Sequence, residues 1–90
     1  MSIKAIIPSY LQSFTNNMEA VEVKGSTVGT CLIDLTRQFP GIKNMLFSKN
    51  GELLNYTGIY VNGEDAYPEV LAKPVEDGDE LKILYVIGGG

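Results

Sequence analysis

The chain has 90 residues, 44% of them hydrophobic, and carries a formal net charge of −4 with no histidine. A chain of this length builds one modest core, so we expect a single domain over residues 1–90 and no deep catalytic cleft. The lack of histidine removes the commonest general base near neutral pH and the commonest metal ligand. With Cys31 as its one cysteine, the chain can form neither an internal disulfide nor a thiolate metal site. We therefore expect no bound metal, no cofactor-binding residues and no standalone enzyme activity.

Acidic residues gather between Glu64 and Glu80, where Lys73 is the one basic residue. Nucleic-acid binding depends on lysine and arginine, so this charge pattern argues against a nucleic-acid partner. It favours either a solvated acidic rim or attraction toward a basic partner. The N-terminal residues lack the apolar region of a signal peptide, and no stretch is long enough to span a membrane. We expect a soluble cytoplasmic protein with no membrane association.

The first quarter of the chain predicts a β-hairpin. Residues 3–7 are rich in β-branched side chains and stop at Pro8, which is typical of a strand. Residues 19–24 alternate apolar and polar side chains, as a half-buried strand does. The polar segment 12–17 between them suits a turn.

A helix is predicted over residues 27–39. Gly25 ends the preceding strand, and Ser26 or Thr27 can cap the helix. Cys31 lies at the edge of the apolar face, where a small buried side chain is favoured over a nucleophile. The glycines of 25–30 lack the spacing of a phosphate-binding loop, so we interpret them as a strand-to-helix turn. One helical face carries Val28, Leu32, Leu35 and Phe39.

The second half of the chain consists of short connections and strands. Turn signals separate these segments, and Gly78 suits a tight turn because glycine adopts positive φ at little cost. In the final strand we expect Leu81, Ile83 and Tyr85 to point inward. The segments are a helical turn at 42–47, a turn at 50–51, a strand at 59–61, turns at 62–63 and 77–79, and a strand at 81–86.

This order of hairpin, helix and later strands predicts an α+β fold rather than repeated β-α-β units. We expect the β-grasp (ubiquitin-like) arrangement. In it, a four- to five-stranded mixed sheet is covered on one face by the main helix. The first and last strands are central and parallel.

After the last strand the sequence continues as Ile87-Gly88-Gly89-Gly90. Terminal residues without packing are commonly disordered, so we expect a flexible tail over 87–90. A frayed end without function is the alternative interpretation. Glycine lacks a Cβ, which lets a backbone approach a partner surface closely. Leu84, Val86 and Ile87 lie next to the tail and are candidates for an apolar partner-binding anchor, although Leu84 and Val86 can instead be buried in the sheet.

Several motifs carry a resemblance to a known family over nearly the whole chain. They are Asp34-Leu35 in the helix, Ile59-Tyr60-Val61-Asn62-Gly63-Glu64-Asp65, Asp77-Gly78-Asp79-Glu80-Leu81, and the terminal Gly89-Gly90. With these motifs the sequence resembles the MoaD/ThiS superfamily of ubiquitin-like sulfur carrier proteins, and its length is closest to the CysO-like branch. It departs from the family pattern just before the tail, where prolines are frequent and Tyr85 and Val86 stand here.

The resemblance implies a function for the C-terminal carboxylate of Gly90, with Gly88 and Gly89 as the tail that presents it. An E1-like adenylating enzyme would activate this carboxylate with ATP. A sulfur donor protein or sulfide would then convert it to a thiocarboxylate. A biosynthetic enzyme would accept the sulfur on the way to a cofactor, an amino acid or another metabolite. The sequence names neither the final acceptor nor the donor, and it leaves the oligomeric state open.

Two other functions remain open at this point. The same activated carboxyl group can join Gly90 to lysines of target proteins, which would make the chain a ubiquitin-like protein modifier. A plain interaction domain with an incidental glycine tail is the third possibility.

Overall fold

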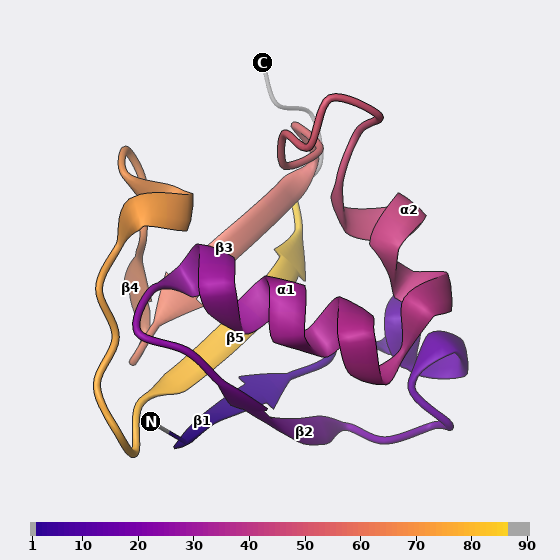
Figure 1. Ribbon diagram of the computed structural model, residues 1–90, viewed down its shortest axis with the longest axis horizontal. Coiled ribbons are helices and arrows are strands. Elements are labelled where there is room, and N and C mark those ends of the chain that lie inside the picture. The colour runs from indigo at the N-terminus through magenta and orange to yellow at the C-terminus, as the bar shows by residue number, and fades with distance from the viewer. Residues whose placement is uncertain (1, 87–90) are drawn as a thin grey trace.

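A five-stranded mixed sheet forms the frame of the molecule, in the order β2-β1-β5-β3-β4 (Figure 1). The computed structural model describes residues 2–86, so the predicted tail at 87–90 lies outside the described residues. The strands are β1 (Ser2–Ile6), β2 (Ala20–Lys24), β3 (Thr57–Val61), β4 (Glu64–Asp65) and β5 (Glu80–Tyr85).

Strands β1 and β5 are the parallel pair near the centre of the sheet, with Ala5 opposite Leu81. β2 flanks β1 and β3 flanks β5, both antiparallel. Because β1 opens the chain and β5 closes the described part, residues from its two ends lie side by side. This is the β-grasp topology predicted from the sequence.

The main helix, α1 (Val28–Gln38), begins at a reciprocal cap formed by two threonines. The Thr30 backbone N–H donates to the Thr27 hydroxyl oxygen at 3.2 Å, and the Thr27 N–H donates to the Thr30 hydroxyl oxygen at 3.0 Å. Such reciprocal bonds satisfy backbone donors that the first helical turn leaves free. Of the two predicted cap residues, Ser26 and Thr27, the structure shows Thr27 as the cap.

Gly25 is required at the junction between β2 and α1. A Cβ at this position would lie 2.5 Å from the Thr30 hydroxyl oxygen and 2.8 Å from the Cys31 nitrogen, distances that no side chain tolerates. The glycine-rich stretch is thus a tight strand-to-helix turn, as the sequence predicts.

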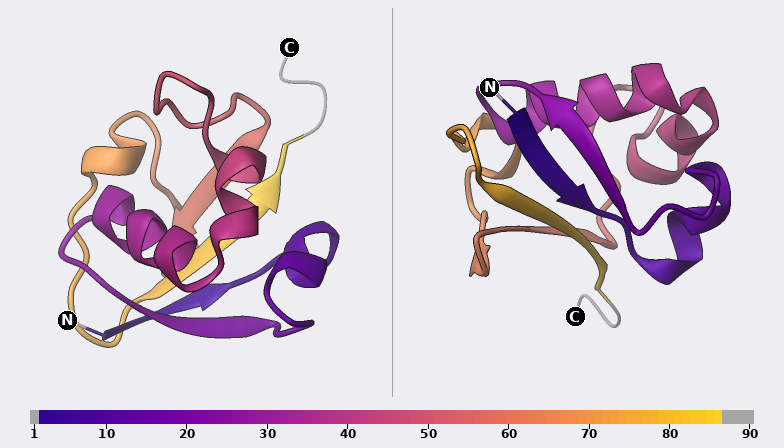
Figure 2. Two further views of the ribbon diagram at one scale, coloured as in Figure 1. Left: turned by 45° about the vertical axis from the view of Figure 1, so that its right-hand side comes forward. Right: turned by 90° about the horizontal axis from the view of Figure 1, so that it is seen from below.

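One core lies between α1 and the sheet (Figures 1 and 2). The helix contributes Val28, Cys31, Leu32 and Leu35, and the alternate strand residues that face it are likewise buried. Cys31 has no exposed surface, which confirms its prediction as a small core side chain. The inward prediction for Tyr85 is wrong: its side chain is 53% exposed because it lies at the end of β5, beyond the buried Leu81 and Ile83.

The hairpin connection is more ordered than the sequence indicates. Residues Ser9–Phe14 form a 3-10 helix, η1, and its Leu11 side chain is fully buried. Asn16 and Asn17 then turn the chain with positive φ values of 53° and 62°. Asparagine tolerates this conformation better than most residues, so the turn signal itself was informative.

Short helices complete the helical layer. They are η2 (Pro40–Ile42), α2 (Lys43–Leu46) and η3 (Val70–Ala72). Ile42 and Leu46 are fully buried, so the predicted helical turn near 42–47 closes one end of the core. No helix among residues 2–86 is long and apolar enough to cross a membrane.

Two of the motifs that carry the family resemblance contact each other. The Asn62 side chain donates to the Asp79 carboxylate at 2.9 Å, and its carbonyl oxygen accepts from the Glu80 N–H at 2.9 Å. The Asp79 carboxylate also accepts from the Glu76 N–H at 2.8 Å. Hydrogen bonds first from Asn62 and then from the Glu76 backbone hold the pKa of Asp79 below its ordinary value. The motifs thus join the β3–β4 turn to the start of β5.

We expect the Asn62–Asp79 contact to make stability depend on pH at the acid end. Because the folded-state pKa of Asp79 is lowered, its contribution is present above the ordinary aspartate pKa of about 3.9 and is lost as pH falls through the lower folded value. Asn62→Ala should therefore lower Tm near pH 7 and differ less from wild type below about pH 3. Thermal denaturation across pH checks this, with Glu69→Gln as a control for an exposed acid. A Tm difference that does not change with pH would contradict it.

We expect Leu11→Ala to destabilise the protein by about 2–5 kcal/mol, because it leaves a cavity beneath η1. Met18→Ala is the matched control: its side chain is 42% exposed, and it should change stability by less than about 0.5 kcal/mol. Denaturant unfolding measures both. Equal losses in the two variants would show that η1 is not an anchored part of the core.

Candidate functional site

The described residues offer no internal catalytic or metal centre. No group of three or more His, Cys, Asp or Glu side chains within residues 2–86 is placed to hold a metal ion. The Cys31 thiol is fully buried, and burial, followed by the nearby Asp34 charge, raises its pKa. A thiol held in its protonated form is a poor nucleophile.

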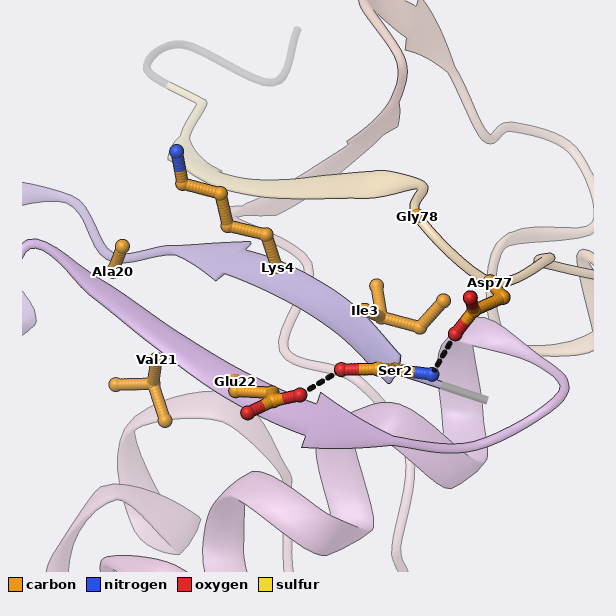
Figure 3. Close-up of a pocket in the computed structure, with 8 residues that line it drawn as sticks. All are labelled: Ser2, Ile3, Lys4, Ala20, Val21, Glu22, Asp77 and Gly78. Atoms are coloured by element: carbon orange, nitrogen blue, oxygen red, sulfur yellow. Dashed lines mark hydrogen bonds between the residues drawn. The ribbon is translucent and has the colours of Figure 1, made fainter.

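A surface hollow of about 460 Å³ lies over β1, β2 and the turn at 77–78 (Figure 3). Polar groups of Ser2, Glu22 and Asp77 in it are already bonded to one another. The Ser2 N–H donates to the Asp77 carboxylate at 2.7 Å, and the Ser2 hydroxyl donates to the Glu22 carboxylate. The hollow lies next to the Asp77–Gly78 turn that precedes β5, at the far end of that strand from the predicted tail. These contacts hold the start of β1 in the sheet.

A second hollow of about 270 Å³ lies beside α1. Its lining is mainly apolar, with Ile33, Phe47 and Leu71 around it and Lys43 as its one charged residue. Its lining pairs Lys43 with no second titratable side chain, so it assembles no acid–base pair.

The predicted tail follows the C-terminal end of β5 in the sequence. β5 lies between β1 and β3, so its end has η1 on one side and the start of β3 on the other. The Val86 N–H donates to the Tyr56 carbonyl oxygen at 2.7 Å and extends the β3–β5 ladder beyond Tyr85. The predicted site residues Ile87, Gly88, Gly89 and Gly90 follow and lie outside the described residues.

Leu84 and Val86 both lie on the sheet face opposite α1. Leu84 pairs with Gly58 and is half-buried, and Val86 is 42% exposed. A Cβ on Gly58 would lie 2.7 Å from Val86 Cγ2, so the Val86 side chain covers this glycine. Neither side chain belongs to the buried core, and both leave surface for a partner. Their role as partner-binding residues stays a prediction.

Three tyrosines meet at the C-terminal end of β5, and sequence reasoning missed this cluster. The Tyr85 ring centroid lies 5.4 Å from that of Tyr10 in an edge-on arrangement and 5.3 Å from that of Tyr56. Burial, and then the neighbouring Tyr56 and Tyr85, raise the pKa of Tyr10. The Tyr10 hydroxyl is buried and finds no hydrogen-bond partner within residues 2–86. The three residues are far apart in sequence, so only the strand order could have revealed the cluster.

Comparisons with known proteins place this geometry in a family. The sequence matches the ThiS family over residues 6–90. It is 34% identical over 93 aligned residues to the sulfur carrier protein CysO of Mycobacterium tuberculosis, with all of both chains covered. It is 34% identical over 71 residues to small archaeal modifier protein 1 of Haloferax volcanii, with 78% of each chain covered.

A solved structure shares the fold closely. The structure of the BexX/CysO complex of Amycolatopsis orientalis contains a chain that superposes with a TM-score of 0.87 at 35% identity, covering 98% of this chain and 99% of that one. The β-grasp fold and the kinship predicted from the motifs are therefore confirmed, and the chain belongs to the ThiS family of ubiquitin-like proteins.

Proposed function

We propose that this protein is a sulfur carrier whose C-terminal Gly90 carboxylate is converted to a thiocarboxylate. The observation that carries the proposal is the match to the sulfur carrier protein CysO across the whole of both chains. The residues agree with it, since residues 2–86 assemble no active site and β5 leads directly into the glycine tail.

Carboxylate chemistry explains why such a carrier needs a partner. An α-carboxyl group has a pKa of about 3.3–3.7, so it is an anion at neutral pH and a poor acyl donor. Transfer of AMP from ATP releases pyrophosphate and turns one carboxylate oxygen into a leaving group. Sulfide then attacks the carbonyl carbon, the bond to AMP breaks, and the acyl carbon keeps sulfur as a thiocarboxylate. The sulfur is already reduced, so this step needs no further reductant.

The partner must supply the activating groups. The Gly25–Thr30 turn is filled by its own cap, so it offers no phosphate-binding loop. We therefore assign ATP binding to an E1-like adenylating enzyme in the cytoplasm. We assign sulfur supply to a donor protein or sulfide, and sulfur use to a biosynthetic enzyme. Complex formation has a precedent, because a CysO protein occurs in complex with BexX in Amycolatopsis orientalis.

Leu84 and Val86 form the apolar surface that we assign to the activating partner, continued by Ile87 in the sequence. They lie on the open face of the sheet directly before the tail. A partner that receives the tail would cover this surface at the same time, and burial of apolar area would offset the cost of ordering the tail.

A second candidate function is favoured by a specific similarity. The chain is 34% identical over 71 residues to small archaeal modifier protein 1 of Haloferax volcanii. In that role the activated Gly90 carbonyl would be attacked by a lysine amine of a target, and an isopeptide bond would replace the bond to AMP. Tryptic digests of cell lysate that contain lysines carrying a remnant of this tail would favour the modifier.

We expect Gly90 to gain sulfur when the protein is incubated with ATP, sulfide and the E1-like enzyme of the same genome. Intact mass should rise by the difference between sulfur and oxygen, and fragmentation should place the change at Gly90. A variant lacking Gly89 and Gly90 is the control and should keep its mass. An unchanged wild-type mass at full ATP and enzyme would contradict the sulfur-carrier proposal.

We expect Leu84→Ala to weaken binding to the activating enzyme, because it removes apolar contact surface next to the tail. KM for the protein should rise about tenfold. This corresponds to a loss of more than about 1 kcal/mol of binding free energy, as is found when an important interface residue is truncated. Lys24→Ala is the matched control: this exposed residue also faces away from α1, but lies on β2 at the other side of the sheet. Equal KM values for wild type and Leu84→Ala would remove Leu84 from the partner surface.

A further inference from the structure

Several contacts converge on Tyr85 and Val86, the last two described residues before the tail. The Tyr85 ring packs against the rings of Tyr10 and Tyr56. The Val86 N–H donates to the Tyr56 carbonyl oxygen at 2.7 Å. On the opposite face of the sheet, the Val86 side chain covers Gly58 so closely that a Cβ there would lie 2.7 Å from Val86 Cγ2. We call these five residues the strand-end clamp.

The topology explains why the clamp reaches both faces of the sheet. β1 runs parallel to β5, so η1, which follows β1, lies beside the end of β5 and brings Tyr10 there. β3 runs antiparallel to β5, so Tyr56 and Gly58 at the start of β3 lie on the other side of that end. The left view of Figure 2 shows η1 beside the end of β5.

The contacts matter because a strand end without them frays. Residues that fray in the free protein must be ordered when a partner receives the tail, and ordering one residue weakens binding by a factor of about 5–30. Proline before the tail, frequent in the family that the sequence resembles, limits this loss by fixing φ. Here neither Tyr85 nor Val86 is a proline, so the restraint on their backbone has to come from packing.

We propose that Tyr10, Tyr56 and Gly58 are positioning residues. They hold Tyr85 and Val86 in the sheet, so that these two residues are already fixed when a partner receives the tail. The proposal rests on the proposed function, because it assigns the clamp to the activation of Gly90. The existence of the clamp can be tested without any partner.

Tyr10 gives the cleanest variant. Side chains at 84 and 85 point to opposite faces of the strand, and Tyr10 contacts Tyr85, so Tyr10 lies off the face that carries Leu84. A change at Tyr10 therefore removes no atom from the assigned partner surface, so any effect on binding comes from the order of the strand end. Tyr10→Ala removes the ring, whereas Tyr10→Phe keeps the ring and removes a buried hydroxyl that has no partner within residues 2–86.

The first measurement is amide hydrogen exchange in the free protein. In Tyr10→Ala we expect exchange at the Val86 N–H to accelerate about tenfold, which corresponds to the loss of one aromatic pair. Amides in the β1–β2 ladder should keep their rates, and Tyr10→Phe should match wild type. Gly58→Ala is a second variant that disturbs the clamp from the opposite face, and it should also accelerate Val86.

The second measurement is the kinetics of adenylation by the E1-like enzyme of the same genome, followed as ATP–pyrophosphate exchange. We expect KM for Tyr10→Ala to rise about 5- to 30-fold with kcat unchanged, because the extra ordering is required on binding. Tyr10→Phe should restore the wild-type KM. If Tyr10 had a purely structural role, Tyr10→Ala would lower the amount of folded protein. It would not raise KM while leaving kcat unchanged.

The outcomes separate the two proposals. Unchanged Val86 exchange in both Tyr10→Ala and Gly58→Ala would overturn the clamp. Faster exchange with an unchanged KM would show a clamp that does not position the tail, and this also overturns the inference. If wild-type protein is not adenylated at all, the proposed function fails, while the exchange rates still decide whether the clamp exists.

Discussion

Parallel pairing of β1 with β5 is the contact on which the rest of the structure depends. It brings the segment after β1 and the segment after β5 to the same end of the sheet, and β3 reaches that end from the other side because it runs antiparallel. Parallel pairing requires a long crossover, and here the intervening chain includes α1, which covers the core. The strand that leads into the tail is therefore central, with a hydrogen-bonded neighbour on each side, whereas an edge strand would have one.

Much of the fold could be predicted because local signals and tertiary packing agree. Thr27 caps α1 and Gly78 adopts φ of +90° in its turn, as their residue types indicate. The sequence does not predict the η1 helix because Leu11 is its one fully buried side chain, and the short segment is flanked by the polar residues of a turn. Strand alternation predicts Tyr85 inward because it reports which face of the sheet a side chain occupies, but it does not report whether other residues cover that face.

The candidate site likewise has a part that the sequence predicts and a part that it does not. The candidate reactive group is the carboxyl of Gly90, which can be proposed from the sequence. Two of the family motifs have a structural role: Asn62 and Asp79 tie the β3–β4 turn to the start of β5. The tyrosines around Tyr85 were not predictable, since each looks like an isolated aromatic until the strand order is known. The motifs therefore predict the fold and the tail, whereas the contacts around Tyr85 can be derived only from the strand order.

The junction between Val86 and Ile87 must meet two opposite physical demands. A tail that enters a narrow partner site needs glycine, which has no Cβ, but glycine also loses the most conformational freedom when it is ordered. Each further residue that has to be ordered adds to this cost, so a carrier gains by keeping every residue before the glycines fixed in the free protein. Contacts on both faces of β5 do this up to Val86: the tyrosine rings restrain one side, and the close approach of Val86 to Gly58 restrains the other. The sequence thus ends in glycines and places two packed side chains, Tyr85 and Val86, shortly before them.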